Sequence, residues 1–196
     1  MTNEPIVSTT VPGAGRPPAL RAVAGFDRAV DKYFEAHLRG HAPLDWLMYG
    51  ASAAAEHSIL WLALAGLQGW HRGHLHRALL RAGAAFAAES VLVNGLVKLA
   101  FRRKRPQSGR PRPLPLRTPR TSSFPSGHAS AAFFAAAVLR DRRSWPFYYA
   151  LAAVVASSRA HVRIHHASDV VAGAALGAVL GEAARRAFRY SERGQM

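Results

Sequence analysis

Apolar stretches and arginine-rich segments alternate along this chain, and this alternation restricts the fold more than any other feature of the sequence. The apolar stretches span residues 46–70, 82–101, 129–139, 145–157 and 170–184, and none of them contains an arginine. The 26 Lys and Arg residues outnumber the 11 Asp and Glu residues, for a formal net charge of +15. Apolar segments separated by basic loops are typical of a membrane protein with several spans, whose loops meet water and anionic lipid.

The apolar stretches predict an all-α integral membrane bundle of about five transmembrane helices, with six as the alternative. A bilayer crossing takes about 20 helical residues, and no stretch shows the period of two that a strand requires. The expected spans are Trp46–Trp70, Ala82–Phe101, Pro125–Leu139, Trp145–Ser157 and Val170–Ala187. Within the last span Gly173, Gly177 and Gly181 lie four residues apart, which predicts close packing against a partner helix.

The two ends of the chain differ in character from the spans. Residues 1–23 are rich in Pro, Gly, Thr and Ser and lack an apolar core of signal-peptide length, so a disordered tail is expected. Residues 24–39 place apolar side chains near one helical face, which favours an amphipathic helix on the membrane surface; a surface helix of a globular protein is the alternative. The expected membrane domain is therefore 24–190, followed by a C-terminal tail, 191–196.

Several polar residues lie inside the expected spans. Glu56 and His57 occupy the middle of the first, and Glu89, Asn94 and Lys98 lie in the second. Polar and charged groups are costly in lipid, so these side chains are expected to face the bundle interior or a water-filled cavity. For Glu56 a structural contact is expected, with a role near the substrate as the alternative, and the role of Glu89 stays open.

Three further polar segments stand at the ends of the spans: Lys98–Pro106, Phe124–His128 and Ser158–Asp169. If the second span continues as a helix, Lys98, Arg102 and Arg105 share one of its faces. A helix that begins in the second segment exposes its first backbone amides, so those of Ser126 and Gly127 are expected to be free donors for an anion. Together the segments predict an anion-binding site.

These segments supply the groups that phosphoryl transfer without a metal requires. Charge spreads over the phosphate oxygens as the transition state forms, and Lys98, Arg105 and Arg159 provide three fixed cations. A neutral imidazole can attack phosphorus, and a second, protonated histidine can donate to the leaving oxygen. Asp169 lies four residues beyond His165, so its carboxylate can hold that imidazole in one tautomer.

The three segments match the patterns K-x6-R-P, P-S-G-H and S-R-x5-H-x3-D at every position, and the chain resembles the type 2 phosphatidic acid phosphatase superfamily. The resemblance implies His165 as the nucleophile, His128 as the acid for the leaving group and Asp169 as the group that orients His165. It also implies five phosphate ligands: Lys98, Arg105, Ser126, Gly127 and Arg159. Neither a metal nor a cofactor is expected.

The resemblance implies a multi-pass lipid phosphatase in the inner or plasma membrane, where membrane lipids surround the protein. Its substrate is then a lipid phosphate, and the reaction passes through a phosphohistidine intermediate. Candidate substrates are a polyprenyl phosphate, undecaprenyl diphosphate, phosphatidic acid, phosphatidylglycerol phosphate and decaprenyl-phosphoryl-5-phosphoribose. Many bacterial members have six spans. The five-span pattern therefore leaves open whether the active site faces the cytoplasm or the extracytoplasmic side of the membrane. Basic residues lean toward a cytoplasmic site, whereas the resemblance points to the extracytoplasmic face. The oligomeric state is left open.

Two other classes of protein share part of this pattern. A soluble acid phosphatase or haloperoxidase relative carries the same site, but the lack of an export signal and the Trp-bounded stretch 46–70 favour a membrane protein. The basic run 102–124 resembles a nucleic-acid-binding arm, yet it lies between apolar spans and includes Arg105, so no nucleic-acid partner is expected. A metal site is also disfavoured, because the chain has no cysteine and the nearby carboxylate is already assigned, despite three neighbouring histidines, His161, His165 and His166.

Overall fold

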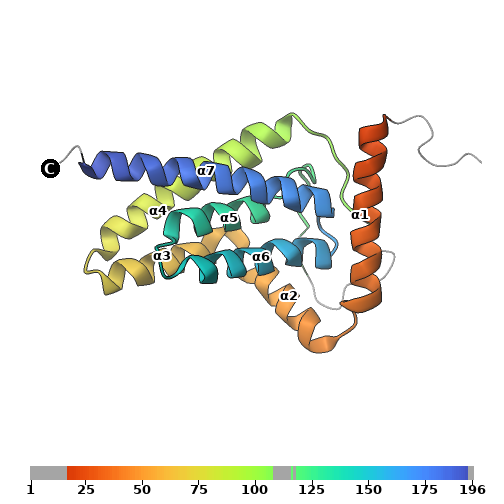
Figure 1. Cartoon of the computed structure of the whole chain (residues 1–196), viewed down its shortest axis with the longest axis horizontal. Coiled ribbons are helices and arrows are strands. Elements are labelled where there is room, and N and C mark those ends of the chain that lie inside the picture. The colour runs from red at the N-terminus through yellow and green to blue at the C-terminus, as the bar shows by residue number, and fades with distance from the viewer. Residues whose placement is uncertain (1–16, 108–115, 117, 194–196) are drawn as a thin grey trace, which may run out of the picture.

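The computed structural model describes residues 17–107, 116 and 118–193, and within these ranges the chain is helical with no β-strand. The elements are α1 (Pro18–His37), α2 (Ala42–Ala54), the short 3-10 turn η1 (Glu56–Ser58), α3 (Ile59–His71), α4 (Leu75–Ser90), the π-helix η2 (Val91–Val97), α5 (Gly127–Leu139), α6 (Trp145–His161) and α7 (Ala167–Arg193). Helices α3 to α7 extend along the long axis of the molecule, and α1 stands across one end of them (Figure 1). The all-α prediction is confirmed.

Helix α5 occupies the centre of the bundle. Its sequence is apolar on all sides and rich in alanine, which is the pattern of a helix enclosed by others. It contacts α6 on one side and α7 on another, and the alanines Ala129, Ala132, Ala135, Ala136 and Ala137 are fully buried. Because short side chains cover α5, its neighbours can approach closely.

The closest approach is between α5 and α7, where the predicted glycine contact is confirmed. A Cβ atom at Gly173 would overlap the carbonyl oxygen of Ser126, and one at Gly177 would overlap that of Ser130. At Gly181 a Cβ atom would lie 2.7 Å from the carbonyl oxygen of Phe134. The two helices therefore meet backbone to backbone along three turns, and α5 and α7 are held in one fixed register.

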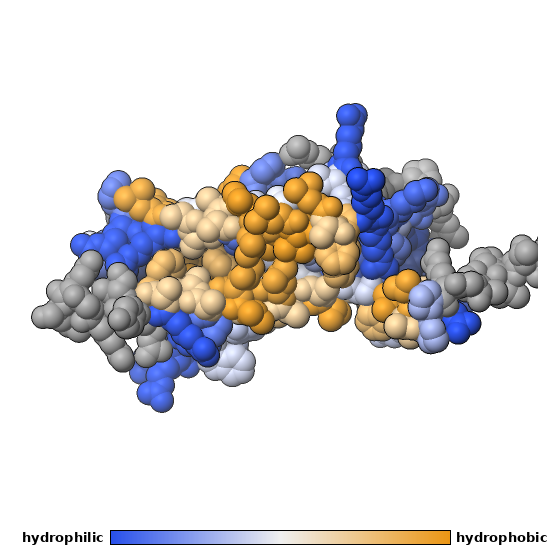
Figure 2. Space-filling model, turned by 90° about the horizontal axis from the view of Figure 1, so that it is seen from above, coloured by the Kyte–Doolittle hydropathy of each residue, from blue (hydrophilic) through white to orange (hydrophobic). Residues whose placement is uncertain are grey.

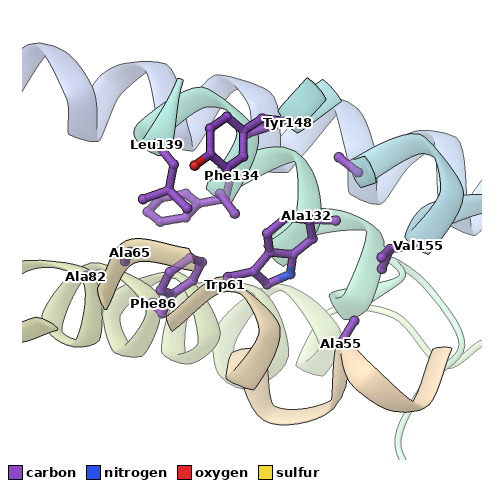
Figure 3. Packing of buried hydrophobic residues seen from close by; sticks show 13 residues of the cluster. Ala55, Trp61, Ala65, Ala82, Phe86, Ala132, Phe134, Leu139, Tyr148 and Val155 are labelled. Atoms are coloured by element: carbon purple, nitrogen blue, oxygen red, sulfur yellow. The ribbon is translucent and has the colours of Figure 1, made fainter. Parts of the chain in front are cut away.

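Aromatic side chains fill the space between α3, α4, α5 and α6. Figure 3 shows Trp61 of α3 and Phe86 of α4 packed next to Ala132 and Phe134 of α5, with Tyr148 above them. The rings of Phe86 and Phe134 meet edge to face with centroids 5.4 Å apart. Nε2 of Gln68 donates to the hydroxyl oxygen of Tyr148 at 2.7 Å, which satisfies the polar end of that aromatic side chain inside the bundle.

The expected single span Trp46–Trp70 is wrong. Helix α2 ends at Ala54 and α3 begins at Ile59, and between them His57 and Ser58 adopt positive φ angles of 52° and 60°. A left-handed residue cannot continue the helical hydrogen-bond pattern, so the chain changes direction there, as Figure 1 shows between α2 and α3. The polar triplet Glu56–Ser58 therefore lies at a bend and not in the middle of a straight helix.

Two helix boundaries also differ from expectation. Helix α1 begins at Pro18, so residues 18–23 are helical and were wrongly assigned to the tail; proline at a first helical position costs no hydrogen bond. Helix α7 continues to Arg193, past the expected end of the domain at 190. The remaining expected tail residues, 1–16 and 194–196, lie outside the described residues.

By length and apolar composition, two helical segments among the described residues suit a bilayer crossing. They are Leu75–Val97, formed by α4 with η2, and Ala167–Phe188 of α7. Helix α5 is apolar but shorter, and it is enclosed by its neighbours. These segments overlap the expected second, fifth and third spans, respectively, although the first of them lies several residues earlier than the expected 82–101.

Candidate active site

A cavity of about 480 Å³ opens at the end of the bundle where α5 begins. Five of the eight residues expected in the site line it: Lys98, Arg105, Gly127, His128 and His165. They come from the residue after η2, the segment 101–107, the start of α5 and the turn between α6 and α7. The three sequence motifs, far apart in the chain, therefore meet in one place.

Lys98 and Arg105 reach this cavity without the helix that was expected to align them. The helix that contains η2 ends just after Lys98, and residues 101–107 have no helical structure. Arg102, expected on the same face, is exposed and does not line the cavity. The guanidinium of Arg105 is instead held by carbonyl oxygens, 3.0 Å from that of Ile164 and 3.2 Å from that of Thr121.

The start of α5 is tied directly to the start of α7. The backbone amide of Ser126 donates to the carbonyl oxygen of Asp169 at 3.0 Å, and the Ser126 side chain caps α5 by accepting from the amide of Ala129 at 3.4 Å. The expectation that the Ser126 amide is a free donor is therefore wrong. Ser126 is buried behind the cavity wall, and Gly127 lines the cavity itself. The helix dipole of α5 still places its positive end here.

His165 is held in one tautomer by the backbone. Its Nδ1 lies 2.7 Å from the carbonyl oxygen of Ser123, and because a carbonyl oxygen only accepts, Nδ1 carries the proton. Nε2 then carries the lone pair, and it accepts from Nη1 of Arg105 at 3.1 Å. The arrangement leaves Nε2 as the nucleophilic atom, next to a cation that binds phosphate well.

The surroundings also keep His165 uncharged. Burial, together with Arg105 and Arg159, lowers the pKa of His165 to about 4, although Asp169 opposes the shift. An imidazole with this pKa is neutral at pH 7, which is the form that attacks phosphorus.

Asp169 acts on His165 less directly than its spacing predicts. Its carboxylate lies 3.8 Å from Nδ1 of His165, beyond hydrogen-bond distance. Oδ2 of Asp169 accepts from Oγ of Ser123 at 2.5 Å and from the amide of His166 at 2.9 Å. The carboxylate is fully buried. Asp169 therefore fixes Ser123, and the carbonyl group of Ser123 fixes the imidazole.

A second set of contacts continues from Asp169 to helix α1. Nη1 of Arg103 donates to Oδ1 of Asp169 at 2.6 Å, and Nη2 donates to Oδ2 of Asp27 at 2.5 Å. Asp27 also accepts from the amide of Ser168 at 2.8 Å and from its hydroxyl at 2.9 Å. None of Asp27, Arg103 and Ser123 was expected in the site. Arg103 lies inside the first motif and Ser123 just before the second, whereas nothing in the sequence around Asp27 signals this contact.

His128 and Arg159 occupy different layers of the site. Nε2 of His128, a cavity residue, is buried without a hydrogen-bond partner among the residues that the structure describes. Arg159 does not line the cavity; it is 3% exposed and donates to Oγ of Ser52 on α2. Its charge still reaches His165, as the lowered pKa of that imidazole shows.

The same cavity is also lined by a second set of polar groups. Glu89, Ser90 and Asn94 line it from α4 and η2, and Glu56 lines it from the bend before α3. Oε1 of Glu89 accepts from Oγ of Ser130 at 2.5 Å, so this carboxylate is fixed at the cavity wall. The Asn94 side chain covers Gly127 so closely that a Cβ atom there would overlap it.

The other histidines close to the site have separate partners. Nε2 of His161 lies 2.7 Å from Oδ1 of Asp45 on α2, within hydrogen-bond distance. His166 approaches the carbonyl oxygen of Lys104 at 3.3 Å.

Comparisons with known proteins agree with this geometry. The model of the PAP2 superfamily matches residues 78–193. A decaprenylphosphoryl-5-phosphoribose phosphatase from Mycobacterium tuberculosis is 38% identical over 133 residues, which cover 67% of this chain and 73% of that protein. The protein of the same name from Mycolicibacterium smegmatis is 35% identical over 119 residues, covering 60% of this chain and 64% of that protein. A transmembrane PAP2 type phosphatidylglycerolphosphate phosphatase from Bacillus subtilis shares the fold, with a TM-score of 0.68 and 21% identity over 90% of this chain and 89% of that one.

Proposed function

Since the chain belongs to the PAP2 superfamily, as its three motifs predicted, we propose that it is a membrane phosphatase that hydrolyses a lipid phosphate through a phosphohistidine intermediate. The orientation of His165 carries this proposal, because its Nδ1 is bound to a carbonyl oxygen and its Nε2 lies beside Arg105. An imidazole held in this way presents an unprotonated nitrogen to a phosphate bound between the cations.

Two steps follow from this orientation. Nε2 of His165 attacks phosphorus, the bond between phosphorus and the lipid alcohol oxygen breaks, and Nε2 of His128 gives a proton to that oxygen. The now neutral His128 then takes a proton from water, whose oxygen attacks the phosphohistidine and releases phosphate and neutral His165. His128 can take both roles because it lines the same cavity as His165 and its Nε2 has no other hydrogen-bond partner in the described part of the protein. The negative charge of a bound phosphate favours the protonated imidazole that the first step requires. The net reaction consumes one water and yields an alcohol and inorganic phosphate.

Side-chain cations take the place of a metal ion in this proposal. Lys98 and Arg105 line the cavity and bind the phosphate oxygens, with Gly127 beside them at the positive end of α5. Arg159 is buried behind the cavity wall, and its positive charge attracts the phosphate without touching it. Ser126 holds the start of α5 in place as its cap. Preorganised donors of this kind stabilise the charge of the transition state without further rearrangement.

The surface of the protein supports a position inside a membrane. A band of hydrophobic residues crosses the middle of the face shown in Figure 2, and hydrophilic residues lie at both ends of it. Large apolar side chains are exposed on α3, α4, η2 and α7, among them Ile59, Leu80, Val91, Leu96 and Val179. Apolar surface of this extent is covered by lipid in a multi-pass protein, and it disfavours a soluble relative of the phosphatases.

Helix α1 supports the same placement. Several of its large apolar side chains point outward, with Leu20 55%, Phe26 46% and Tyr33 57% exposed, whereas Asp27 is 8% exposed on the inner face. A soluble surface helix has the reverse arrangement. We therefore place α1 in the membrane interface, with its outer face in contact with lipid.

For the substrate, we propose a lipid in which the phosphate is attached to a hydroxylated group, with decaprenylphosphoryl-5-phosphoribose as the first candidate. The two mycobacterial relatives are named as phosphatases of this lipid. The lining of the cavity fits such a group, because Ser90 and Asn94 can donate to and accept from sugar hydroxyls, and Glu89 accepts from them. A second phosphate would meet the carboxylates of Glu56 and Glu89 there, which disfavours a diphosphate.

Phosphate release by the detergent-purified full chain tests this function. The panel contains decaprenylphosphoryl-5-phosphoribose, phosphatidylglycerol phosphate, phosphatidic acid and undecaprenyl diphosphate. We expect the highest kcat/KM with the phosphoribose lipid, unchanged activity in EDTA, and inhibition by vanadate, which mimics five-coordinate phosphorus. Activity that chelation abolishes and a divalent ion restores would contradict the metal-independent mechanism, and a preference for the diphosphate would contradict the substrate assignment.

A further inference from the structure

Helix α1 contributes a buried charge to the site although it lies outside the segment that matches the family model. The match to the PAP2 superfamily begins at residue 78, whereas α1 ends at His37. Asp27 nevertheless lies two hydrogen bonds from the carboxylate of Asp169, with Arg103 between them. We propose that Asp27 is a positioning residue of the active site, which acts through Arg103 on Asp169 and His165.

The contacts of Asp27 are too specific for a helix that merely covers the bundle. Both of its carboxylate oxygens are used, Oδ1 by the amide of Ser168 and Oδ2 by the hydroxyl of Ser168 and by Arg103. Ser168 directly precedes Asp169 at the start of α7. Asp27 therefore fixes both the backbone that carries Asp169 and the cation that pairs with it.

The charges along this line alternate, which gives Asp27 an electrostatic role as well. Asp169 and Asp27 are negative, and Arg103 between them is positive. Arg103 alone would cancel much of the field that Asp169 exerts on His165, and Asp27 offsets that cancellation. The other charged or titratable groups near His165 among the described residues are the neighbouring His166, the cation Arg159, and the groups that line the same cavity: Arg105, His128, Lys98, His57, Glu56 and Glu89.

A separate pair of contacts keeps α1 docked and supplies a matched control. Arg163, in the turn before His165, donates to Oε2 of Glu35 at 2.8 Å and to Oδ1 of Asp31 at 3.3 Å. Asp31 lies one helical turn after Asp27, but its side chain is half exposed and has no contact with Arg103 or Asp169 among the described residues. Asp31→Asn therefore removes a charge from the same helix without touching the line to Asp169.

The inference rests on the proposed function and is tested with Asp27→Asn, which keeps the shape of the side chain and removes its charge. We expect kcat/KM to fall about ten- to hundredfold, as for other residues that act through a neighbour of the reacting group. The acid limb of the pH profile should move to lower pH, because the surroundings of His165 become more positive. Asp31→Asn should leave both quantities near those of the wild type, and Asp27→Glu should return the acid limb to its original position.

The direction of the shift separates positioning from structural damage. If Asp27→Asn merely loosened the site, water would reach His165, its pKa would rise toward the ordinary value of about 6.5, and the limb would move to higher pH. That result, or an unchanged profile, would overturn the proposal. The pH dependence of His165 modification by diethyl pyrocarbonate, followed by mass spectrometry, reports the same pKa without turnover. An inactive wild type in the lipid panel would therefore contradict the proposed function and still leave this inference testable.

Discussion

The carbonyl oxygen of Ser123 lies 2.7 Å from Nδ1 of His165, closer than any carboxylate oxygen to that imidazole. Ser123 holds this position because its own hydroxyl donates to Asp169. The orientation of the proposed nucleophile thus depends on a backbone group that no side-chain substitution removes. Side-chain changes act only by letting that carbonyl move.

Ser123→Ala should consequently reduce activity less than Asp169→Asn. The alanine variant loses one hydrogen bond to a carboxylate, and we expect kcat to fall about tenfold. The asparagine variant removes the charge and disturbs Ser123, Arg103 and the His166 amide together, so we expect a fall of more than about a hundredfold. Steady-state kinetics on one lipid substrate compares the two. Equal losses would mean that Asp169 acts through Ser123 alone.

Variants of the two histidines should differ in whether a phosphoenzyme forms. His165→Ala is expected to abolish turnover and to give no trapped phosphoenzyme. His128→Ala should still become phosphorylated by a substrate with a good leaving group, such as p-nitrophenyl phosphate, since that group needs little protonation. Rapid quenching and mass spectrometry locate the phosphoryl group. If the phosphoryl group appeared on another residue of the His165→Ala variant, the assignment of His165 as the nucleophile would be wrong.

The pH dependence of kcat/KM should reflect the lowered pKa of His165, about 4. The imidazole must be neutral to attack, so the acid limb of the profile should lie near this pKa, with activity lost as the pH falls through it. An ordinary histidine would already be mostly protonated at pH 5.5 (its pKa is about 6.5). A profile from pH 3.5 to 8 in a stable detergent measures the acid limb, and a limb near 6.5 would argue against a buried neutral nucleophile.

Gly177→Ala should destabilise the protein and reduce its activity together. The added methyl group overlaps the carbonyl oxygen of Ser130, and a forced backbone shift of this kind costs about 1–3 kcal/mol. Gly50→Ala is the matched control, because Gly50 lies exposed in α2 with nothing within 4 Å of its Cβ position. That change should raise stability by about 0.5–1 kcal/mol. Thermal unfolding in detergent distinguishes the two, and an unchanged Tm for Gly177→Ala would contradict the close packing of α5 on α7.

The spacing of the motifs was sufficient to predict four residues that line the cavity, namely Lys98, Arg105, His128 and His165. They belong to short sequence patterns whose chemistry can be inferred before the fold is known. The bend at His57 was not predictable in the same way, because no glycine or proline marks its positive φ angle. It follows from tertiary contacts that override the apolar pattern on both sides.

The contacts of Asp27 and Arg103 escaped prediction for a different reason. An aspartate among the polar residues of an amphipathic helix has the pattern of a solvated face, and an arginine in a basic run has the pattern of a loop charge. Their pairing joins residues more than 70 positions apart, as the separation of 76 in this hydrogen bond shows. Only the docking of α1 across the end of the bundle brings them together (Figure 1).

The glycine contact between α5 and α7 also bears on when this protein becomes an enzyme. Helix α7 is the last helix among the described residues, and it carries Asp169 to the start of α5, where the Ser126 amide binds the Asp169 carbonyl. Until α7 has been synthesised and packs against α5, Asp169 cannot hold Ser123, whose carbonyl oxygen orients the imidazole of His165. A nascent chain that lacks α7 is therefore expected to be inactive toward the lipids around it.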